Sequence, residues 1–304
     1  MSALKEFQHK LSLHPKIIYK CQEPLAKHTT LRIGGPTTYW VEPGNIDELQ
    51  FIIAATHELK LDNRIIGGGS NLLISERDYA GVSIHLSDDN FGEADINDDG
   101  SIRFGSGMRL NQCLKFLIEH GYADCEFLAG IPANVGGAIA MNAGSGSTSI
   151  SDFVCEVEVL NKSGGIQKLK PQDIVFSYRS TDLLDKVIIR ATLKFPKGPK
   201  EITRQKLDDY ANKRKLTQDL QRPSAGCMFA NPETGNQSAG ALIEASGLKG
   251  KQIGQAQISP IHANFVINLG GAQFNDTLQL IQLAEQQVQT QFNINLRREI
   301  QIWT

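Results

Sequence analysis

The sequence predicts an α+β fold, in which strands and helices alternate irregularly and some strands are joined directly by tight turns. Two kinds of pattern lead to this class: short alternating runs bounded by turn residues, and longer runs with helical periodicity. A third is the alternation on both sides of Ser-Gly-Gly in residues 154–170, which predicts a β-hairpin. With 304 residues, 40% hydrophobic and 21% charged, the chain can form two or three domains with sizeable cores.

The elements of the N-terminal two thirds follow in order. Residues 37–42 alternate β-branched and aromatic side chains and predict a strand. Residues 44–59 predict an amphipathic helix, because Asn45 can cap it and Leu49, Ile52, Ile53 and Leu59 recur on one face. Two strands joined by a glycine turn are predicted at 64–75, further strands at 81–87, 101–107 and 186–195, and a helix at 109–122.

The composition changes near residues 196–203, where a charged helix (200–216) begins, and we place the main domain boundary there. Beyond it the patterns predict a short helix at 239–246, strands at 252–259 and 264–269, a long helix at 275–292 and a final strand at 297–303.

Charge and cysteine usage limit the classes of function. A formal net charge of −2 without any long basic run argues against a nucleic-acid partner. The N-terminus lacks an apolar signal-peptide core, and no run of 18 apolar residues occurs, so we expect a cytoplasmic protein without a membrane partner. The five scattered cysteines contain no CxxC pair, which predicts reduced thiols and no metal site.

Two stretches contain more glycine than a core needs, "GGGSNLL" from Gly67 and "AGIPANVGGAIAMNAGSGS" at 129–147. Glycines permit positive φ and close backbone approach, and successive exposed N–H groups can bind a pyrophosphate. Neither stretch fits a Walker A loop or a GxGxxG fingerprint, so a Rossmann nicotinamide site is not supported. We interpret the pair as a dinucleotide cradle, with plain turn structure as the open alternative.

Several polar residues are candidates for chemistry, yet each has an ordinary structural explanation. Arg179 can bind a carboxylate or phosphate in a bidentate manner, although most arginines form surface ion pairs. Cys227, taken alone, is interpreted as a small buried apolar residue. Glu299 is interpreted as a solvent-facing residue of a strand. Asn231, His262 and Asn264 offer further polar groups. Composition alone does not show that these residues meet.

The order of the motifs along the chain is more specific evidence than any single motif. The segments "KHTTLRIGGPTTYWV", "IIGGGSNLLIS", "FLAGIPANVGGAIAMNAG", "FSYRST", "PSAGCMFANP", "AGALIEASGLKG", "HANFVIN" and "LRREIQIW" run from about residue 20 to the end. In this order they resemble the UDP-N-acetylenolpyruvoylglucosamine reductase (MurB) family, flavoenzymes of bacterial peptidoglycan precursor synthesis. Few residues separate "FSYRS" from "KVIIRATLKF", which resembles the shorter subclass without an inserted tyrosine-bearing loop.

The resemblance implies an FAD-binding unit of the PCMH/vanillyl-alcohol-oxidase type, made of two subdomains, followed by an α+β substrate domain. We expect the subdomains at 1–85, with strand 295–304 returning to it, and 86–198, and the substrate domain at 199–294. FAD is expected to bind non-covalently, with NADPH as co-substrate and a nucleotide-sugar as substrate. We expect a monomer.

The implied reaction reduces UDP-N-acetylglucosamine enolpyruvate to UDP-N-acetylmuramate. By resemblance, Arg179 clamps the enolpyruvate carboxylate and stabilises the developing charge, Cys227 occupies the proton-donor position, and Glu299 assists electrostatically or in proton relay. The implied cofactor residues are Arg32, Gly34, Ile66, Gly67, Gly68, Gly69, Ser70, Asn71, Leu72, Gly130, Ile131, Pro132, Val135, Gly136, Gly137, Ala138, Asn142, Ala143 and Gly144. The implied substrate contacts are Tyr178, Lys213, Arg214, Gly226, Asn231, His262 and Asn264.

The sequence departs from the family pattern at a few positions. Cys227 stands where serine is most common, and a thiol, with an unperturbed pKa near ~8.5, can still donate a proton. Ala133–Asn134 replaces Gly-Thr or Gly-Ser, Ala230 replaces a common lysine, and "SGSTS" follows "NAG". Two alternatives stay open: a PCMH-type flavin oxidase of a sugar or alcohol, and a flavin-binding member without turnover.

Overall fold

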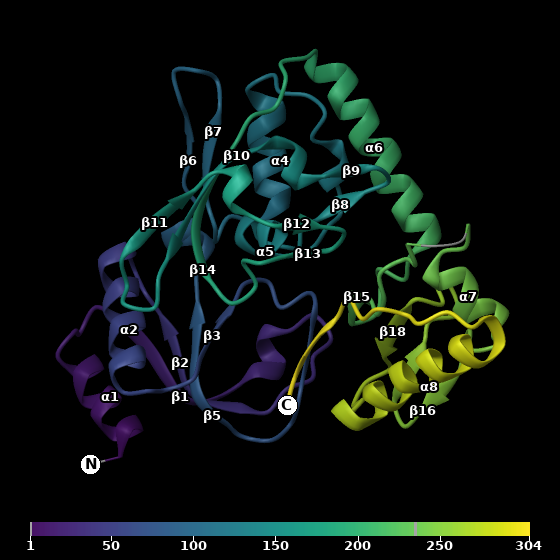
Figure 1. The fold of residues 1–304 in the computed structure, drawn as a ribbon, viewed down its shortest axis with the longest axis horizontal. Helices are drawn as coiled ribbons and strands as arrows, with labels where there is room; N and C mark the ends of the chain where they lie inside the picture. The colour runs from purple at the N-terminus through teal and green to yellow at the C-terminus, as the bar shows by residue number, and fades with distance from the viewer. Residues whose placement is uncertain (1, 234–235) are drawn as a thin grey trace. The chain divides into compact units, whose positions relative to one another are not determined.

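The computed structural model describes residues 2–233 and 236–304, which group into two compact units (Figure 1). The first unit contains residues up to 23, 37–68 and 79–212, and the second contains 24–36, 69–78 and 213–304. Both units mix helices and strands, as the sequence predicted. The second unit is therefore assembled from three segments that are far apart in the chain.

The first sheet of the first unit has the strand order β1-β2-β5-β3. Its strands are β1 (Ile18–Pro24), β2 (Pro36–Glu42), β3 (Asn63–Ile66) and β5 (Tyr79–His85). Strands β2 and β3 both pair in parallel with β5, and α2 (Ile46–Glu58) connects them. The Asn45 side chain caps α2 by accepting a hydrogen bond of 2.9 Å from the Glu48 N–H, as predicted. Helix α1 (Ala3–Ser12) and α2 pack in the same apolar core as this sheet.

The second sheet is antiparallel, with the order β11-β10-β14-β7-β6. Its strands are β6 (Ala94–Ile96), β7 (Ile102–Gly105), β10 (Val154–Leu160), β11 (Ile166–Leu169) and β14 (Val187–Leu193). Strands β10 and β11 form the hairpin predicted at 154–170. Alternate residues such as Val157 and Val159 face a core shared with α4 (Leu110–Glu119) and α5 (Val135–Ala140).

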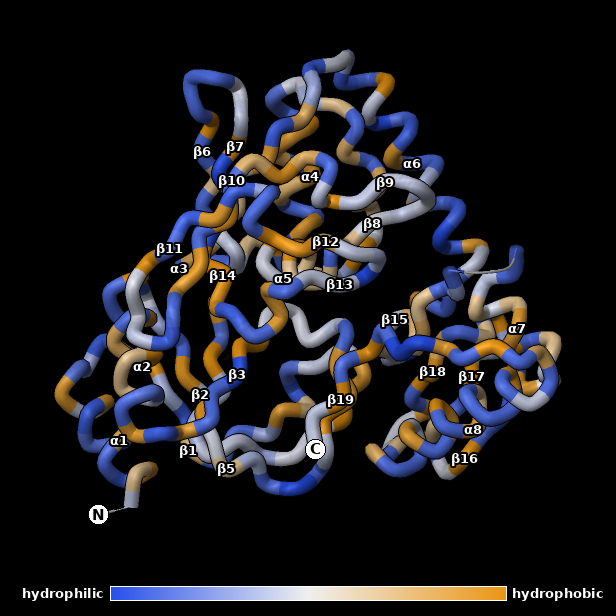
Figure 2. The backbone as a smooth tube through the Cα atoms, viewed as in Figure 1, coloured by the Kyte–Doolittle hydropathy of each residue, from blue (hydrophilic) through white to orange (hydrophobic). Residues whose placement is uncertain are grey.

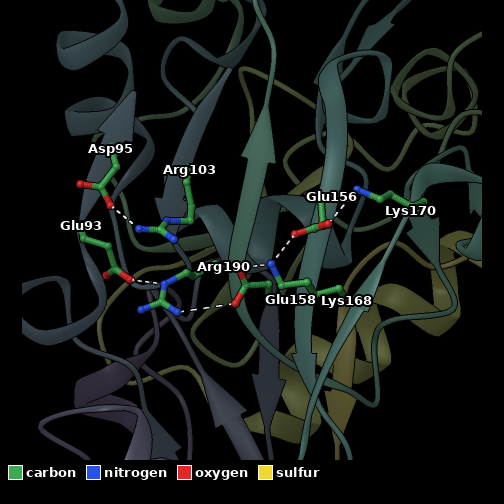
Figure 3. Close-up of polar contacts among 8 residues, drawn as sticks. All are labelled: Glu93, Asp95, Arg103, Glu156, Glu158, Lys168, Lys170 and Arg190. Carbon is green, nitrogen blue, oxygen red and sulfur yellow. Dashed lines mark hydrogen bonds and ion pairs between the residues drawn. The ribbon is translucent and has the colours of Figure 1, made fainter. Parts of the chain in front are cut away.

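The intervening residues of this sheet carry a network of ion pairs, which we call the charged face (Figure 3). Its ion pairs are Arg190 with Glu93 (2.7 Å) and Glu158 (3.5 Å), Lys170 with Glu156 (2.8 Å), Lys168 with Glu156 (3.1 Å) and Glu158 (3.8 Å), and Arg103 with Asp95 (2.9 Å). Opposite charges thus face each other across neighbouring strands, the arrangement that stabilises sheet pairs.

Short elements connect these layers. They are α3 (Asp88–Phe91), β8 (Gly144–Ser145), β9 (Thr148–Ser149), β12 (Phe176–Ser177) and β13 (Ser180–Thr181). Strands β12 and β13 form a two-residue hairpin with Tyr178 and Arg179 at its tip. The sequence had placed these two residues simply before a strand, so the hairpin is a finding of the structure.

The second unit has an antiparallel sheet with the order β15-β18-β17-β16. Its strands are β15 (Ser224–Cys227), β16 (Gln252–Ile253), β17 (Ala256–Ile258) and β18 (Phe265–Asn268), with helices α7 (Ala239–Ala245) and α8 (Phe274–Phe292). The prediction of one strand at 252–259 is wrong, because Gly254 adopts a φ of +53° and turns the chain into a hairpin.

A two-stranded parallel pair completes the second unit. Strand β4 (Leu72–Ile74) pairs with β19 (Gln301–Trp303), with Leu72 opposite Gln301. The final strand is shorter than the predicted 297–303. Residues from all three segments, including Leu31, Leu73 and Phe229, share one apolar core.

Helix α6 (Lys200–Thr217) contains the limit between the units, because residues from Lys213 onward are grouped with the second. It is hydrophilic along most of its length (Figure 2). Thr203, near its start, is buried. Among the described residues, no helix combines the length and apolar character that a membrane crossing requires.

Candidate active site

In the first unit, the β12–β13 hairpin is fastened to the glycine-rich stretch at 129–147. The Thr181 hydroxyl donates to the Ala140 carbonyl (2.7 Å), and the Asn142 side-chain amide donates to the Ser177 carbonyl (2.9 Å). These bonds hold both strands of the hairpin, so its tip has a defined place beside Asn142.

Arg179 at the hairpin tip is strained and well oriented. Its φ is +56°, a conformation that costs a residue other than glycine roughly 1–2 kcal/mol. Its Nη2 donates to the Gly144 carbonyl at 2.6 Å, and its guanidinium lies 5.3 Å from the centre of the Tyr178 ring. A guanidinium has five N–H donors, and the bond to Gly144 uses one of them. The structure therefore brings Arg179, Tyr178, Asn142 and Gly144 together.

Asn142 has a structural function in this arrangement. It is buried and adopts a φ of +43°, which asparagine tolerates better than most residues. Besides donating to Ser177, its Oδ1 accepts from the Ser151 N–H at 3.2 Å. The side chain thus fixes the turn that follows α5.

The two glycine stretches meet within the first unit. A Cβ added to Gly68 would lie 3.2 Å from Asn134 Oδ1 and 3.4 Å from the Pro132 carbonyl oxygen, and one added to Gly67 would lie 3.6 Å from Asn134 Cβ. Asn134 is buried and donates to the Gly107 carbonyl at 2.6 Å. The structure therefore places Gly67 and Gly68 beside the stretch that begins at Gly130.

Two glycines of α5 show whether a large flat group could approach this backbone. A Cβ added to Gly136 would contact Ser106 Cβ at 2.8 Å, so Gly136 is needed for internal packing. A Cβ added to Gly137 would meet nothing within 4 Å, and Gly137 is exposed. Packing does not require glycine at 137, whereas a ligand lying against the helix backbone would, so the residues present fit a bound cofactor.

The apolar cofactor candidates serve mainly the core. Val135, Ala138 and Ala143 are buried in the core cluster of the second sheet, and Ile66 is buried at the end of β3. Ile131 is half-buried and Pro132 is exposed, while Gly130 adopts a φ of +68°.

In the second unit, three predicted turns meet. Thr30 donates through its N–H to the Gly69 carbonyl (3.1 Å) and through its hydroxyl to the Ser224 carbonyl (2.6 Å). A Cβ on Gly69, whose φ is +61°, would overlap the His28 carbonyl oxygen. The turns at 30–35, 69–72 and 224–227 are thereby joined, and Gly226, at a φ of +73°, would place a Cβ 4.0 Å from the Ser70 carbonyl oxygen.

The turn at residues 30–35 departs in one detail from the predicted residues. Arg32 is exposed with a φ of +60°, and Gly34, at a φ of +151°, would place a Cβ only 3.1 Å from the Ala26 nitrogen. At Gly35, a Cβ would overlap the carbonyls of Glu76 and Arg77. Gly35 is thus a second glycine that this turn requires, and the sequence did not distinguish it.

Cys227 and Glu299 lie on adjacent segments of the second unit. Cys227 ends β15 opposite Phe265, and the next residue, Met228, accepts a hydrogen bond of 2.8 Å from the Glu299 N–H. Asn71 Nδ2 donates to the Glu299 carbonyl at 3.0 Å. The structure thereby places three predicted residues, Asn71, Cys227 and Glu299, within one small region.

Other predicted substrate contacts have protein partners. Both amide atoms of the buried Asn264 bond to Phe229, with Nδ2 donating to the carbonyl (2.7 Å) and Oδ1 accepting from the N–H (3.0 Å). His262 Nδ1 accepts from the Asn264 N–H at 3.2 Å, and burial lowers the pKa of His262. Asn231 Oδ1 accepts from the Ala239 N–H at the start of α7.

Lys213 and Arg214 lie in the last part of α6. Lys213 is exposed, and Arg214 Nε donates to Gln218 Oε1 at 3.1 Å. Leu72, at the start of β4, is half-buried and pairs with Gln301.

The candidate residues divide between the units. The first contains Tyr178, Arg179, residues 66–68 and residues 130–144, and the second contains Arg32, Gly34, residues 69–72, Cys227 and Glu299. Sequence reasoning missed Thr30, Thr181 and Gly35, whose function is to hold the turns, and it treated Asn134 only as a departure. Their bonds are to backbone groups distant in sequence, which no local pattern reveals.

Comparison with known proteins identifies the family of this chain. Residues 218–303 match the family model of the UDP-N-acetylenolpyruvoylglucosamine reductase C-terminal domain, and residues 37–170 match that of an FAD binding domain. The UDP-N-acetylenolpyruvoylglucosamine reductase of Halalkalibacterium halodurans is 38% identical over 286 residues, 93% of either chain. The chain belongs to the UDP-N-acetylenolpyruvoylglucosamine reductase family.

Further members of this reductase family support the assignment. The reductase of Listeria monocytogenes is 36% identical over 290 residues, 95% of this chain and 96% of its own. The crystal structure of the reductase (MurB) from Thermus caldophilus matches with a TM-score of 0.80 at 32% identity, covering 95% of this chain and 99% of that one. The predicted α+β fold, with an FAD-binding part of the PCMH type and a C-terminal domain, is confirmed.

A glucose dehydrogenase, Phl p 4.0202, shares only the fold with this reductase-family chain. Its TM-score is 0.50 at 11% identity, covering 64% of this chain and 44% of that one. The matched ranges 37–170 and 218–303 do not test the predicted limits at 85, 198 and 294, which stay predictions.

Proposed function

We propose that the protein reduces UDP-N-acetylglucosamine enolpyruvate to UDP-N-acetylmuramate with NADPH in peptidoglycan precursor synthesis. The observation that carries the proposal is the close relationship to reductases over nearly the full chain, at 38% identity and a TM-score of 0.80. When bound, FAD would supply the hydride acceptor and donor of this chemistry.

The backbone of two glycine-rich regions would hold FAD. One region consists of Gly67 and Gly68 beside Pro132 and Asn134. Gly137 is exposed, and a Cβ added to it would meet no atom within 4 Å. The turns joined by Thr30, which include Arg32, Ser70 and Asn71, form the other. Backbone N–H groups of such turns, together with the exposed Arg32, are suited to phosphate oxygens.

Arg179 would bind the enolpyruvate carboxylate and stabilise the negative charge that develops during hydride transfer. Its place at a strained hairpin tip, held through Gly144, restricts the guanidinium to few orientations, and such restriction favours electrostatic stabilisation. Tyr178 at the same tip is exposed and would contact the nucleotide-sugar.

Cys227 would donate the proton to the carbon next to the one that receives hydride, and Glu299 would act beside it. Cys227 is half-buried at the end of β15, and Glu299 lies on the segment bonded to Met228. Gly226, Asn231 and His262 would contact the substrate near Cys227, and Lys213 and Arg214 would supply cations for its phosphates. We further propose a cytoplasmic monomer.

The decisive experiment is spectroscopic. We expect the purified protein to be yellow or to take up FAD, and to oxidise NADPH much faster when UDP-N-acetylglucosamine enolpyruvate is present. Colourless protein that cannot take up FAD would contradict the proposal. Oxygen consumption with sugars or alcohols, independent of the enolpyruvyl substrate, would indicate an oxidase instead, and flavin binding without either activity would indicate a non-catalytic member.

A further inference from the structure

Phe229, two residues after Cys227, bonds to a side chain and not to a backbone group on the edge that faces β18. Cys227 pairs with Phe265 across β15 and β18, so a continued antiparallel ladder would place Ala263 opposite Phe229. The chain instead turns at residues 262–265, where the Phe265 N–H donates to the His262 carbonyl at 3.0 Å. The backbone of Ala263 is therefore not the partner of Phe229.

The side chain of Asn264 takes over this function. Its Nδ2 donates to the Phe229 carbonyl at 2.7 Å and its Oδ1 accepts from the Phe229 N–H at 3.0 Å. Its own carbonyl accepts from the Met228 N–H at 2.8 Å. A side-chain amide has the same donor and acceptor as a peptide group, so Asn264 continues the ladder by one step. It is only 2% exposed, which excludes competition by water.

The opposite edge of residues 228–230 binds the segment that contains Glu299. The Met228 carbonyl accepts from the Glu299 N–H at 2.8 Å, and the Ala230 N–H donates to the Arg297 carbonyl at 3.0 Å. Residues 228–230 thus form a short bridge, with Asn264 bonded to one edge and residues 297–299 to the other.

We propose that Asn264 is a positioning residue, which fixes Cys227 relative to Glu299 by acting as a surrogate peptide for the adjoining strand. This rests on the proposed function in assigning proton donation to Cys227. Without the Asn264 amide, Phe229 loses both partners on that edge, and Cys227, two residues earlier, loses its fixed place. A displacement of about 1 Å in a catalytic group can reduce a rate by ~10²-fold.

The chain offers a matched control in Asn268, on the same strand. Asn268 is also buried, and its Nδ2 donates to the Leu31 carbonyl at 3.0 Å while its Oδ1 accepts from the Gly270 and Ala272 N–H groups. Asn264→Asp and Asn268→Asp each replace one buried amide donor by an acceptor. We expect similar losses of thermal stability from the two substitutions, and Asn264→Ser is used if Asn264→Asp does not fold.

The first measurement follows alkylation of Cys227 by iodoacetamide as a function of pH. All proteins compared carry Cys21→Ser and Cys155→Ser, which remove the other accessible thiols and define the background protein. Peptide mass spectrometry distinguishes alkylation of Cys227 from that of the buried Cys113 and Cys125. We expect Asn264→Asp to change the rate and pH profile of Cys227 alkylation, and Asn268→Asp to leave both as in the background. This measurement needs neither flavin nor substrate, so it decides the positioning of Cys227 even if the proposed function fails.

The second measurement separates the two half-reactions by stopped flow. We expect Asn264→Asp to leave flavin reduction by NADPH within a small factor of wild type, and to slow reoxidation by the enolpyruvyl substrate by ~10- to 10²-fold. The proposal is overturned if Asn264→Asp matches Asn268→Asp in alkylation or in the reoxidation rate. Failure to bind FAD in all variants, wild type included, would instead contradict the proposed function.

Discussion

Cys227 combines an unusual residue type with an unusual backbone. It follows Gly226, which adopts a φ of +73°, and the pairing of β15 with β18 shifts register between Ser224 and Cys227. The thiol is therefore placed by a bulge, a feature often found where a strand must redirect a side chain. This placement argues for a function beyond filling the core.

Substitution of Cys227 distinguishes a proton donor from a packing residue. We expect Cys227→Ser to retain near-normal turnover, because a hydroxyl can donate at the same place, and Cys227→Ala to lose at least ~10²-fold, the scale of general acid catalysis. Steady-state kinetics with the enolpyruvyl substrate provide the measurement. Full activity of the alanine variant would return Cys227 to a purely structural function.

Arg179 should be sensitive to a change that keeps its charge. Arg179→Lys removes the planar donor array and the reach to Gly144, so we expect kcat/KM for the enolpyruvyl substrate to fall by ~10²-fold. Arg103→Lys, on the charged face, is the control and should leave kcat/KM unchanged. An equal effect of both substitutions would remove Arg179 from the reaction.

At the scale of elements, the glycines divide into those that packing requires and those it does not. Gly69→Ala would force a Cβ onto the His28 carbonyl at positive φ, whereas Gly137→Ala meets open space on a helix. We expect Gly69→Ala to unfold or strongly destabilise the protein. Gly137→Ala should stabilise the apoprotein by up to ~1 kcal/mol, since alanine favours helix over glycine.

The same Gly137→Ala substitution tests the cofactor cradle, because the added methyl group occupies the space open beside α5. We expect a weaker affinity for FAD, measured by titration of flavin fluorescence, together with the unchanged or raised thermal stability of the apoprotein. Unaltered FAD affinity would show that the cofactor lies elsewhere.

Sequence periodicity predicted long elements such as α2 and the β10–β11 hairpin, but it missed the β12–β13 hairpin. Its strands have two residues each, and its turn is Tyr178–Arg179 rather than a glycine- or asparagine-containing pair. The hairpin exists because Thr181 and Asn142 bond to backbone groups from another part of the chain. Such tertiary bonds have no local signal, which is also why Asn264 was assigned to the substrate from its motif.

At the scale of the whole molecule, the charged face contributes to the dependence of stability on pH. The hydrogen bond from Lys170, and then that from Lys168, hold the pKa of Glu156 below its ordinary value. A carboxyl with a lowered folded-state pKa stabilises the protein above its unfolded-state pKa, and this contribution is lost as the pH falls through the folded-state value.

We therefore expect Glu156→Gln to reduce the slope of stability against pH between about pH 5 and 3, below the ordinary glutamate pKa of about 4.3. Urea unfolding at a series of pH values measures it. Glu201→Gln, in the exposed first turn of α6, is the control and should keep the wild-type slope. A wild-type slope in Glu156→Gln would show that these ion pairs are too exposed to matter.

The motifs of the sequence indicated the family, but not how the chain is interleaved. The second unit combines residues 24–36 and 69–78 with residues 213–304. Thr30, Asn71 and Asn268 make the bonds that join these segments, each to a backbone carbonyl. A carbonyl acceptor leaves no trace in the sequence, so such pairings become visible only in three dimensions.

This interleaving has a consequence for the order in which the protein is made. Strand β4 leaves the ribosome early, but its partner β19 follows only near residue 301, and Asn71 and Glu299 are 228 residues apart. Until then the edge of β4 has no strand to pair with and is exposed to other chains. The emerging chain must therefore keep an incomplete second unit in solution while the first unit is already complete, and we expect chaperones to matter most during that interval.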